Sequence, residues 1–134
     1  MEKKIEDLEN FKKAITSTVK SIIGEQNIDI VFGNDESKKN INTIYLPSIQ
    51  NINNKIDYTK TRALADSEAL KLRCSDINIY NTFEPDGNIS KLLYAAAEKV
   101  RYENIGSSYF KGVKKNLNQY YKTKTKQKID YKNN

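Results

Sequence analysis

The segment over residues 58–76, "YTKTRALADSEALKLRCSD", constrains the fold more than any other part of the chain. At 100° per residue its apolar residues fall on two sides of a helix. One side carries Ala63, Leu70, Cys74 and the following Ile77, and the other carries Ala65, Ala69 and Leu72. A helix that is apolar around much of its circumference has to be covered on several sides. We therefore predict a central helix on which the other elements pack.

Helical periodicity recurs in three further segments. Apolar residues at three- and four-residue spacings predict a helix over residues 4–23 that ends at Gly24, and a long helix over residues 89–105 that ends at Gly106. The long helix is expected to bury the face formed by Ile89, Leu93, Ala96, Ala97 and Val100. A short final helix is predicted over residues 113–121, and residues 77–83 fit either a short helix or an extended connector.

Two short segments have the period of two that is typical of strands. "NIDIVFG" alternates apolar and polar residues, and "INTIYLP" reads as a second strand that Pro47 ends. The turn-rich "GNDESKKN" between them predicts a hairpin, and residues 48–57 are predicted to form a loop. The predicted fold class is α+β and predominantly helical, with about four helices and one small β-hairpin near residues 28–46.

The length and the distribution of charge predict one domain with a tail. A chain of 134 residues has room for one sizeable core, which we place in residues 1–121. The net charge is +6, but residues from 111 onward hold eight lysines and a single acid, so the rest is nearly neutral. Residues 122–134 are predicted to be a disordered tail or the start of a linker. A basic tail leaves a nucleic-acid-binding domain as one alternative, although lysines in place of arginines favour a solvated tail.

Several classes of function are excluded by composition. The chain has no histidine, which rules out His-Cys zinc clusters, Ser-His-Asp triads and histidine general bases. Cys74 is the single cysteine, so no intramolecular disulfide forms and a reducing compartment is expected. The charged start "MEKKIEDLENFKK" has no apolar core of a signal peptide, and no apolar run reaches membrane-spanning length. We expect a cytoplasmic protein.

Some polar residues fall on helix faces that are expected to be buried. Asp66 lies within the apolar arc of the central helix, with Arg62 one turn before it. In the long helix, Asn104 lies in the middle of the apolar face and Arg101 lies on its border. An unpaired buried carboxylate costs several kcal/mol, about what a buried ion pair loses when one partner is removed. The sequence therefore predicts an ion pair between Asp66 and Arg101 that joins the two helices.

The alternative is a stand-alone enzyme in which Asp66, Glu98 and Glu103 act as paired acids. Glu98 and Glu103 are five residues apart and so fall on different helix faces. Neither an EF-hand spacing nor a glycine-rich phosphate loop is present in the sequence. We assign no catalytic, cofactor-binding or metal-binding residue, and the carboxylate-dependent enzyme stays an alternative.

Two blocks of the sequence resemble the N-terminal region of the cobaltochelatase subunit CobT. "TRALADSEALKLRCSD" is similar to the family pattern TRG-x-ADS-x-AL-x-HD, and "LYAAAEKVRYENIGSSYFKGVKKNL" is similar to E-x-x-R-x-E-x-x-G-x-x-x-x-x-G-x-x-x-NL. The resemblance covers nearly all of residues 11–121. The chain departs from the pattern at Ala63, where the family has glycine, and at Ser75, where a histidine is expected. Family members continue into a von Willebrand A-type domain, which we expect this chain to lack.

The resemblance implies a subunit of the ATP-dependent complex that inserts cobalt into the corrin ring in cobalamin biosynthesis. The implied partners are an AAA+ ATPase subunit and a large corrinoid-binding subunit, and ATP, Mg and cobalt are implied for the whole complex. For this segment we expect a non-catalytic role in assembly and coupling. The candidate structural or interface residues are Arg62, Asp66, Glu98, Arg101, Glu103, Asn104, Gly106, Gly112 and Asn116.

Overall fold

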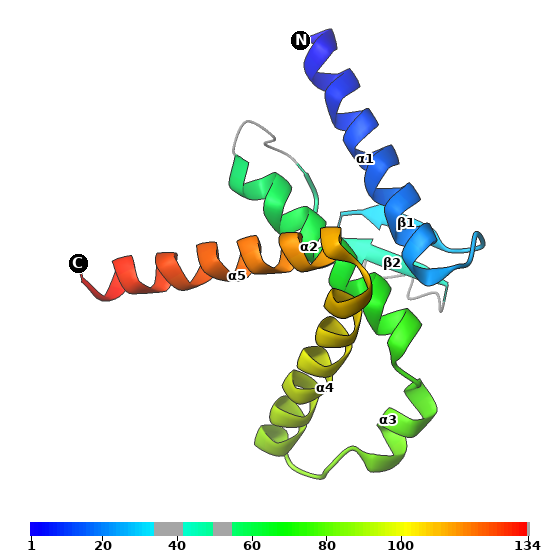
Figure 1. Cartoon of the computed structure of the whole chain (residues 1–134), viewed down its shortest axis with the longest axis vertical. Coiled ribbons are helices and arrows are strands. Elements are labelled where there is room, and N and C mark those ends of the chain that lie inside the picture. Colours follow the sequence, from blue (N-terminus) through cyan, green and yellow to red (C-terminus); the bar gives the residue numbers. More distant parts are fainter. Residues whose placement is uncertain (34–41, 50–54, 134) are drawn as a thin grey trace.

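The computed structural model describes residues 1–33, 42–49 and 55–133, with side chains of the third range from residue 58. The elements in chain order are α1 (Glu2–Ile23), β1 (Asp29–Phe32), β2 (Thr43–Leu46), α2 (Lys55–Cys74), α3 (Ile77–Phe83), α4 (Asn88–Tyr109) and α5 (Lys111–Lys132) (Figure 1). The predicted fold class, mostly helical with a small sheet, is confirmed. Within the described ranges there are five helices, one more than predicted, because residues 77–83 form a helix.

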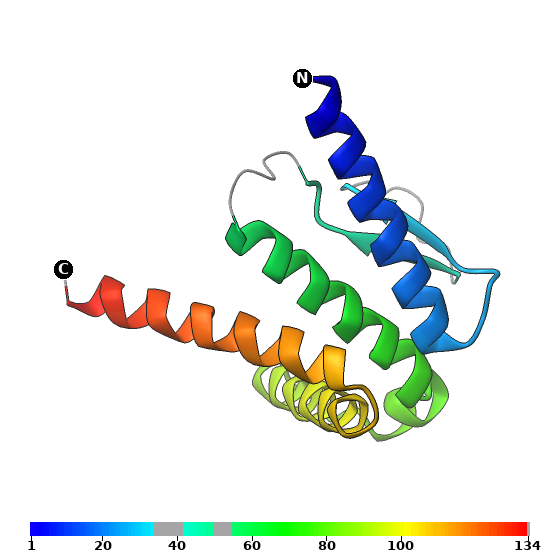
Figure 2. The same cartoon turned by 45° about the horizontal axis from the view of Figure 1, so that its top comes forward.

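Helix α2 is the centre of the fold, as its two apolar sides predict. Helices α1, α4 and α5 and strand β2 all pack on it, and α2 lies between α1 and α5 in Figure 2. Ala65, Ala69 and Leu70 are fully buried, and Ala63 is 1% exposed. Small side chains at these positions let neighbouring helices approach closely.

Helix α1 covers one side of α2. Its buried residues, Phe11, Ile15, Val19 and Ile22, recur at helical spacing and form a single face. The helix ends at Gly24, which has a φ of 80° and donates its N–H to the carbonyl of Lys20. A left-handed residue at this place favours glycine, so the predicted stop is confirmed.

The two strands pair in parallel, so the predicted hairpin is wrong. The register runs from Asp29 opposite Thr43 to Phe32 opposite Leu46. The pairing buries Ile44 and Leu46 of β2, and β2 packs on α2. A parallel pair needs a connection that returns the chain to the end where the first strand began, which a tight hairpin turn cannot do. Residues 34–40 of the predicted turn and residues 50–54 of the predicted loop lie outside the described residues. Residues 55–57, also predicted to be loop, belong to α2.

Helices α4 and α5 are both longer than predicted. Gly106 does not end α4, which continues to Tyr109, and Phe110 then adopts an extended conformation before α5 begins. The segment after residue 121, predicted to be a disordered tail, is helical as far as Lys132. After Gly112 the sequence has neither glycine nor proline, so nothing in it breaks the helix.

Helix α3 and the first half of α4 stand away from the rest of the fold (Figure 1). Asp76 caps α3 by accepting hydrogen bonds from the N–H groups of Asn78 and Ile79, at 2.9 and 3.1 Å. The rings of Tyr80 and Tyr94 pack at 4.7 Å between centroids and join α3 to α4. The Tyr94 hydroxyl also donates to the Tyr80 carbonyl at 3.1 Å, so the two tyrosines tie α3 to α4.

The face of α4 that was predicted to be buried is exposed. Ile89, Leu93 and Val100 are 76, 67 and 59% exposed, and Ala96 and Ala97 are exposed as well. Helix α4 instead meets α2 through its second half, where Tyr102, Glu103 and Gly106 are buried. The apolar periodicity was real, but no element of the described chain covers it.

Candidate functional site

Glu103 is the centre of a hydrogen-bonded cluster that joins three helices. Its carboxylate accepts hydrogen bonds from Ser67 of α2 at 2.6 Å and from Tyr121 of α5 at 2.7 Å, and Glu103 is only 7% exposed. Burial and the bond to Glu103 raise the pKa of Tyr121, and burial raises the pKa of the neighbouring Tyr102 to about 12. Both hydroxyls therefore stay protonated at neutral pH, as a donor to Glu103 must.

Asp66 forms a second link, between α2 and α5. It is 2% exposed, and its Oδ2 accepts a hydrogen bond of 2.7 Å from the side-chain amide of Asn116. Burial raises the pKa of Asp66, against the opposing effects of Asn116 and of the positive charge on Arg62. Arg62 itself is exposed and stacks over the Phe11 ring, 5.3 Å from its centroid.

The predicted ion pair between Asp66 and Arg101 is wrong. Arg101 donates to Glu98, three residues before it on α4, from Nε at 2.9 Å and from Nη2 at 2.6 Å. Its Nη2 also donates to the Cys74 carbonyl at 2.6 Å. Carbonyl groups at a helix end need donors from elsewhere, and the last turn of α2 offers Arg101 that contact.

Glu98 completes this third cluster by accepting a hydrogen bond of 2.6 Å from Ser75. The bonds from Arg101 and Ser75 lower the pKa of Glu98 from 4.5 to about 2. Ser75 is the position where the family pattern has a histidine, and the hydroxyl here takes a structural bond. The three acids of the enzyme alternative, Asp66, Glu98 and Glu103, thus each bind a different set of partners.

The remaining candidates differ in their surroundings. A Cβ at Gly106 would overlap with side-chain atoms of Leu70, so glycine permits the close contact of α4 with α2. A Cβ at Gly112 would meet nothing within 4 Å. Asn104 is exposed, contrary to its predicted burial, because the buried side of α4 is the one that carries Tyr102 and Glu103.

Sequence reasoning missed three residues of these clusters, Ser67, Ser75 and Tyr121. Ser67 follows Asp66 directly in the matched "ADS" triplet, and its position on the central helix was a signal that it is buried. Tyr121 lies at the end of the predicted final helix, where residue spacing gives no sign of a contact with α4. Ser75 differs from the histidine of the family pattern, and nothing in its spacing points to Glu98.

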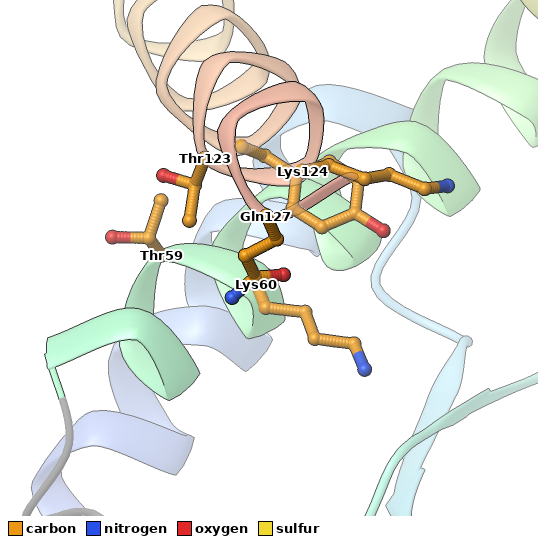
Figure 3. Close-up of a pocket in the computed structure, with 6 residues that line it drawn as sticks. Thr59, Lys60, Thr123, Lys124 and Gln127 are labelled. Carbon is orange, nitrogen blue, oxygen red and sulfur yellow. The ribbon is translucent and has the colours of Figure 1, made fainter. Parts of the chain in front are cut away.

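Two pockets border the helices that carry these clusters. One, of about 540 Å³, is bordered by α1, α2 and the corner between α4 and α5, and includes Asp66, Gly112 and Asn116 in its lining. The other, of about 190 Å³, lies between α2 and α5; Figure 3 shows Thr59 and Lys60 of α2 opposite Thr123, Lys124 and Gln127 of α5. Among the described residues, no group of three or more Asp, Glu or Cys side chains could hold a metal ion.

Seven large apolar side chains of α3 and α4 are left uncovered. We call them together the α3–α4 face: Ile77, Ile79, Phe83, Ile89, Leu92, Leu93 and Val100, all between 59 and 76% exposed. The chain exposes 10246 Å², whereas a compact monomer of 15.4 kDa exposes about 7,200 Å². No helix in the described parts of the chain is long and apolar enough to cross a membrane.

The fold and the clusters define a small, mostly helical domain in which polar residues join helices around a central one. A family model described as cobalamin biosynthesis protein CobT matches residues 6–132. The chain therefore belongs to the CobT family, which supports its involvement in cobalamin biosynthesis. The match continues past residue 121, in keeping with the helix that α5 forms there. No solved structure is significantly similar to the chain.

Proposed function

We propose that the chain is a non-catalytic assembly and coupling domain of an ATP-dependent cobaltochelatase complex, which inserts cobalt into the corrin ring. In this proposal ATP and Mg are bound by an AAA+ ATPase subunit, and the corrinoid by a separate large subunit. Membership of the CobT family supports the pathway. The observation that carries the role is the uncovered α3–α4 face.

The α3–α4 face has the properties of a protein-binding surface. Contiguous apolar patches larger than a few hundred Å² are rare on soluble monomers and mark interaction sites. The seven side chains of the face are each 59 to 76% exposed, and a stable interface covers about 800 Å² of each partner. The occupant to which we assign the face is the ATPase subunit.

The polar clusters suit the coupling part of the role. Ser75, Glu98 and Arg101 fix the middle of α4 to the end of α2, and Ser67 and Glu103 fix α4 one to two turns further on. Helix α4 is held to α2 at two places along its length, so the two helices move as one body. A displacement that a partner imposes on the α3–α4 face would therefore reach the central helix.

Co-purification with the AAA+ ATPase subunit tests the proposal. The wild-type chain is expected to associate in at least one nucleotide state, and Leu93→Glu, which places a charge on the α3–α4 face, is expected to abolish association. Ile129→Glu is the matched control, because Ile129 is a similarly exposed residue (54%) at the far end of α5. Absence of association in every nucleotide state, or equal binding by Leu93→Glu, would overturn the proposal.

A further inference from the structure

The pocket bordered by α1, α2 and the α4–α5 corner has a buried carboxylate in its lining. Asp66 is 2% exposed, and it forms no ion pair with any residue that the structure describes. Its one hydrogen bond comes from Asn116, a neutral amide. Removing a carboxylate from water without a paired cation is costly, so a positive charge brought to Asp66 would be favourable.

The nearby cations of the chain do not supply this charge. Arg62 is one helical turn away, but its guanidinium stacks on Phe11. Lys111 is exposed and lines the pocket without pairing with Asp66. Arg73 contacts the pocket lining, but it donates to the Ile22 carbonyl and does not pair with Asp66. A cation paired with Asp66 would therefore have to come from outside the described chain.

The walls of the pocket suit a flat cation with several donors. Helix α1 contributes hydroxyl groups from Ser17, Thr18 and Ser21, which accept hydrogen bonds. The corner contributes Tyr109 and Phe110, whose rings offer faces on which a guanidinium stacks. One contact on Phe110 is already taken, since the Arg73 guanidinium lies 5.5 Å from its centroid and donates to the carbonyl of Ile22, which also lines the pocket.

We propose that this pocket binds the side chain of an arginine supplied by a partner polypeptide, with Asp66 as the anion that receives the guanidinium. The volume of about 540 Å³ is ample for one such side chain. An ammonium group would satisfy the charge, but it lacks the planar fork that pairs with a carboxylate while stacking on a ring. The pocket lies at the α4–α5 corner, apart from the α3–α4 face, so this proposal stands independently of the ATPase assignment.

The test is an NMR titration of the full chain with N-acetyl-arginine amide, which mimics an arginine inside a polypeptide. We expect millimolar binding with shifts at the amides of residues 109–113, and a Kd at least about tenfold weaker for N-acetyl-lysine amide. Absence of shifts at the corner overturns the proposal, as does equal affinity for the lysine probe. Tighter binding of free arginine would assign the pocket to the free amino acid and overturn the polypeptide source.

Two variants test the residues. Asp66→Asn keeps an acceptor for Asn116 and is expected to weaken binding at least about tenfold, while its thermal midpoint at pH 7 stays level or rises because a desolvated charge is gone. The charge-matched control is Glu68→Gln on the same helix, which is expected to bind like the wild type. Gly112→Leu places a side chain in open space at the pocket and is expected to block it in a folded chain. Undiminished binding by either Asp66→Asn or Gly112→Leu contradicts the assignment.

Discussion

Leu70 of α2 occupies the space beside Gly106 of α4 into which any larger residue would extend its Cβ. Leu70 is fully buried on the central helix. The contact fixes the distance between the two helices at the point where α4 leaves the core. It also explains a glycine in the interior of a helix, where glycine is otherwise unfavourable.

Gly106→Ala is expected to lower the free energy of unfolding by up to about 2 kcal/mol, measured by urea denaturation. Overpacking costs about 1–3 kcal/mol, and the better helix propensity of alanine returns about 1 kcal/mol. Gly112→Ala is the control, because a Cβ at Gly112 meets nothing within 4 Å. Equal stability of the two variants would show that Leu70 yields and that the contact does not set the helix distance.

Tyr121→Phe is expected to destabilise the domain by about 1 kcal/mol, because Glu103 loses one of its two donors while it stays buried. The partial exposure of Tyr121 keeps the effect at the lower end of the usual range. Tyr131→Phe on the same helix serves as the control, since Tyr131 is 88% exposed. If the thermal or chemical denaturation curve of Tyr121→Phe coincides with that of the wild type, Glu103 does not stabilise the contact between α4 and α5.

Glu98 contributes to the free energy of unfolding in a way that depends on pH. Its pKa is about 2 in the folded chain and 4.5 ordinarily, so its contribution is complete above pH 4.5 and is lost as the pH falls toward 2. Glu98→Gln is expected to lower the free energy of unfolding by about 1 kcal/mol at pH 7. The effect is no larger because partial exposure to solvent screens the pair with Arg101. The difference between wild type and variant is expected to shrink between pH 4.5 and 2.

The control for Glu98→Gln is Glu9→Gln, which removes an exposed pair with Lys12 on α1. Its effect is expected to be at most a few tenths of a kcal/mol, as for other surface pairs. A constant difference between Glu98→Gln and the wild type from pH 7 down to pH 2 would contradict the link between Glu98 and acid stability.

The features of the fold that depend on local residue spacing were predicted best. The periodicity of α1, its stop at Gly24 and the two-sided apolarity of α2 follow from local spacing, and all three are confirmed. The direction of strand pairing depends on the path of the connection, which spacing does not encode. The alternating Lys and Thr residues have no apolar periodicity, so spacing did not predict the second half of α5. The helix continues from its first two turns, where Val113 and Leu117 are buried.

The site was less accessible to sequence reasoning because a helical wheel gives a face and not a partner. It placed Asp66 among buried residues correctly, but Asn116 and not Arg101 meets it. It placed Leu93 and Val100 on one face correctly, but could not tell whether that face meets the same chain or another protein. For this reason the sequence predicted a buried face of α4 where the structure has an exposed one.

The claim that the α3–α4 face receives the ATPase subunit is tested most directly by hydrogen–deuterium exchange of the chain, alone and in complex with that subunit. We predict slower exchange in the complex for backbone amides of residues 77–100, with α1 unchanged. Unchanged exchange over residues 77–100 in a complex that is shown to have formed would contradict the account.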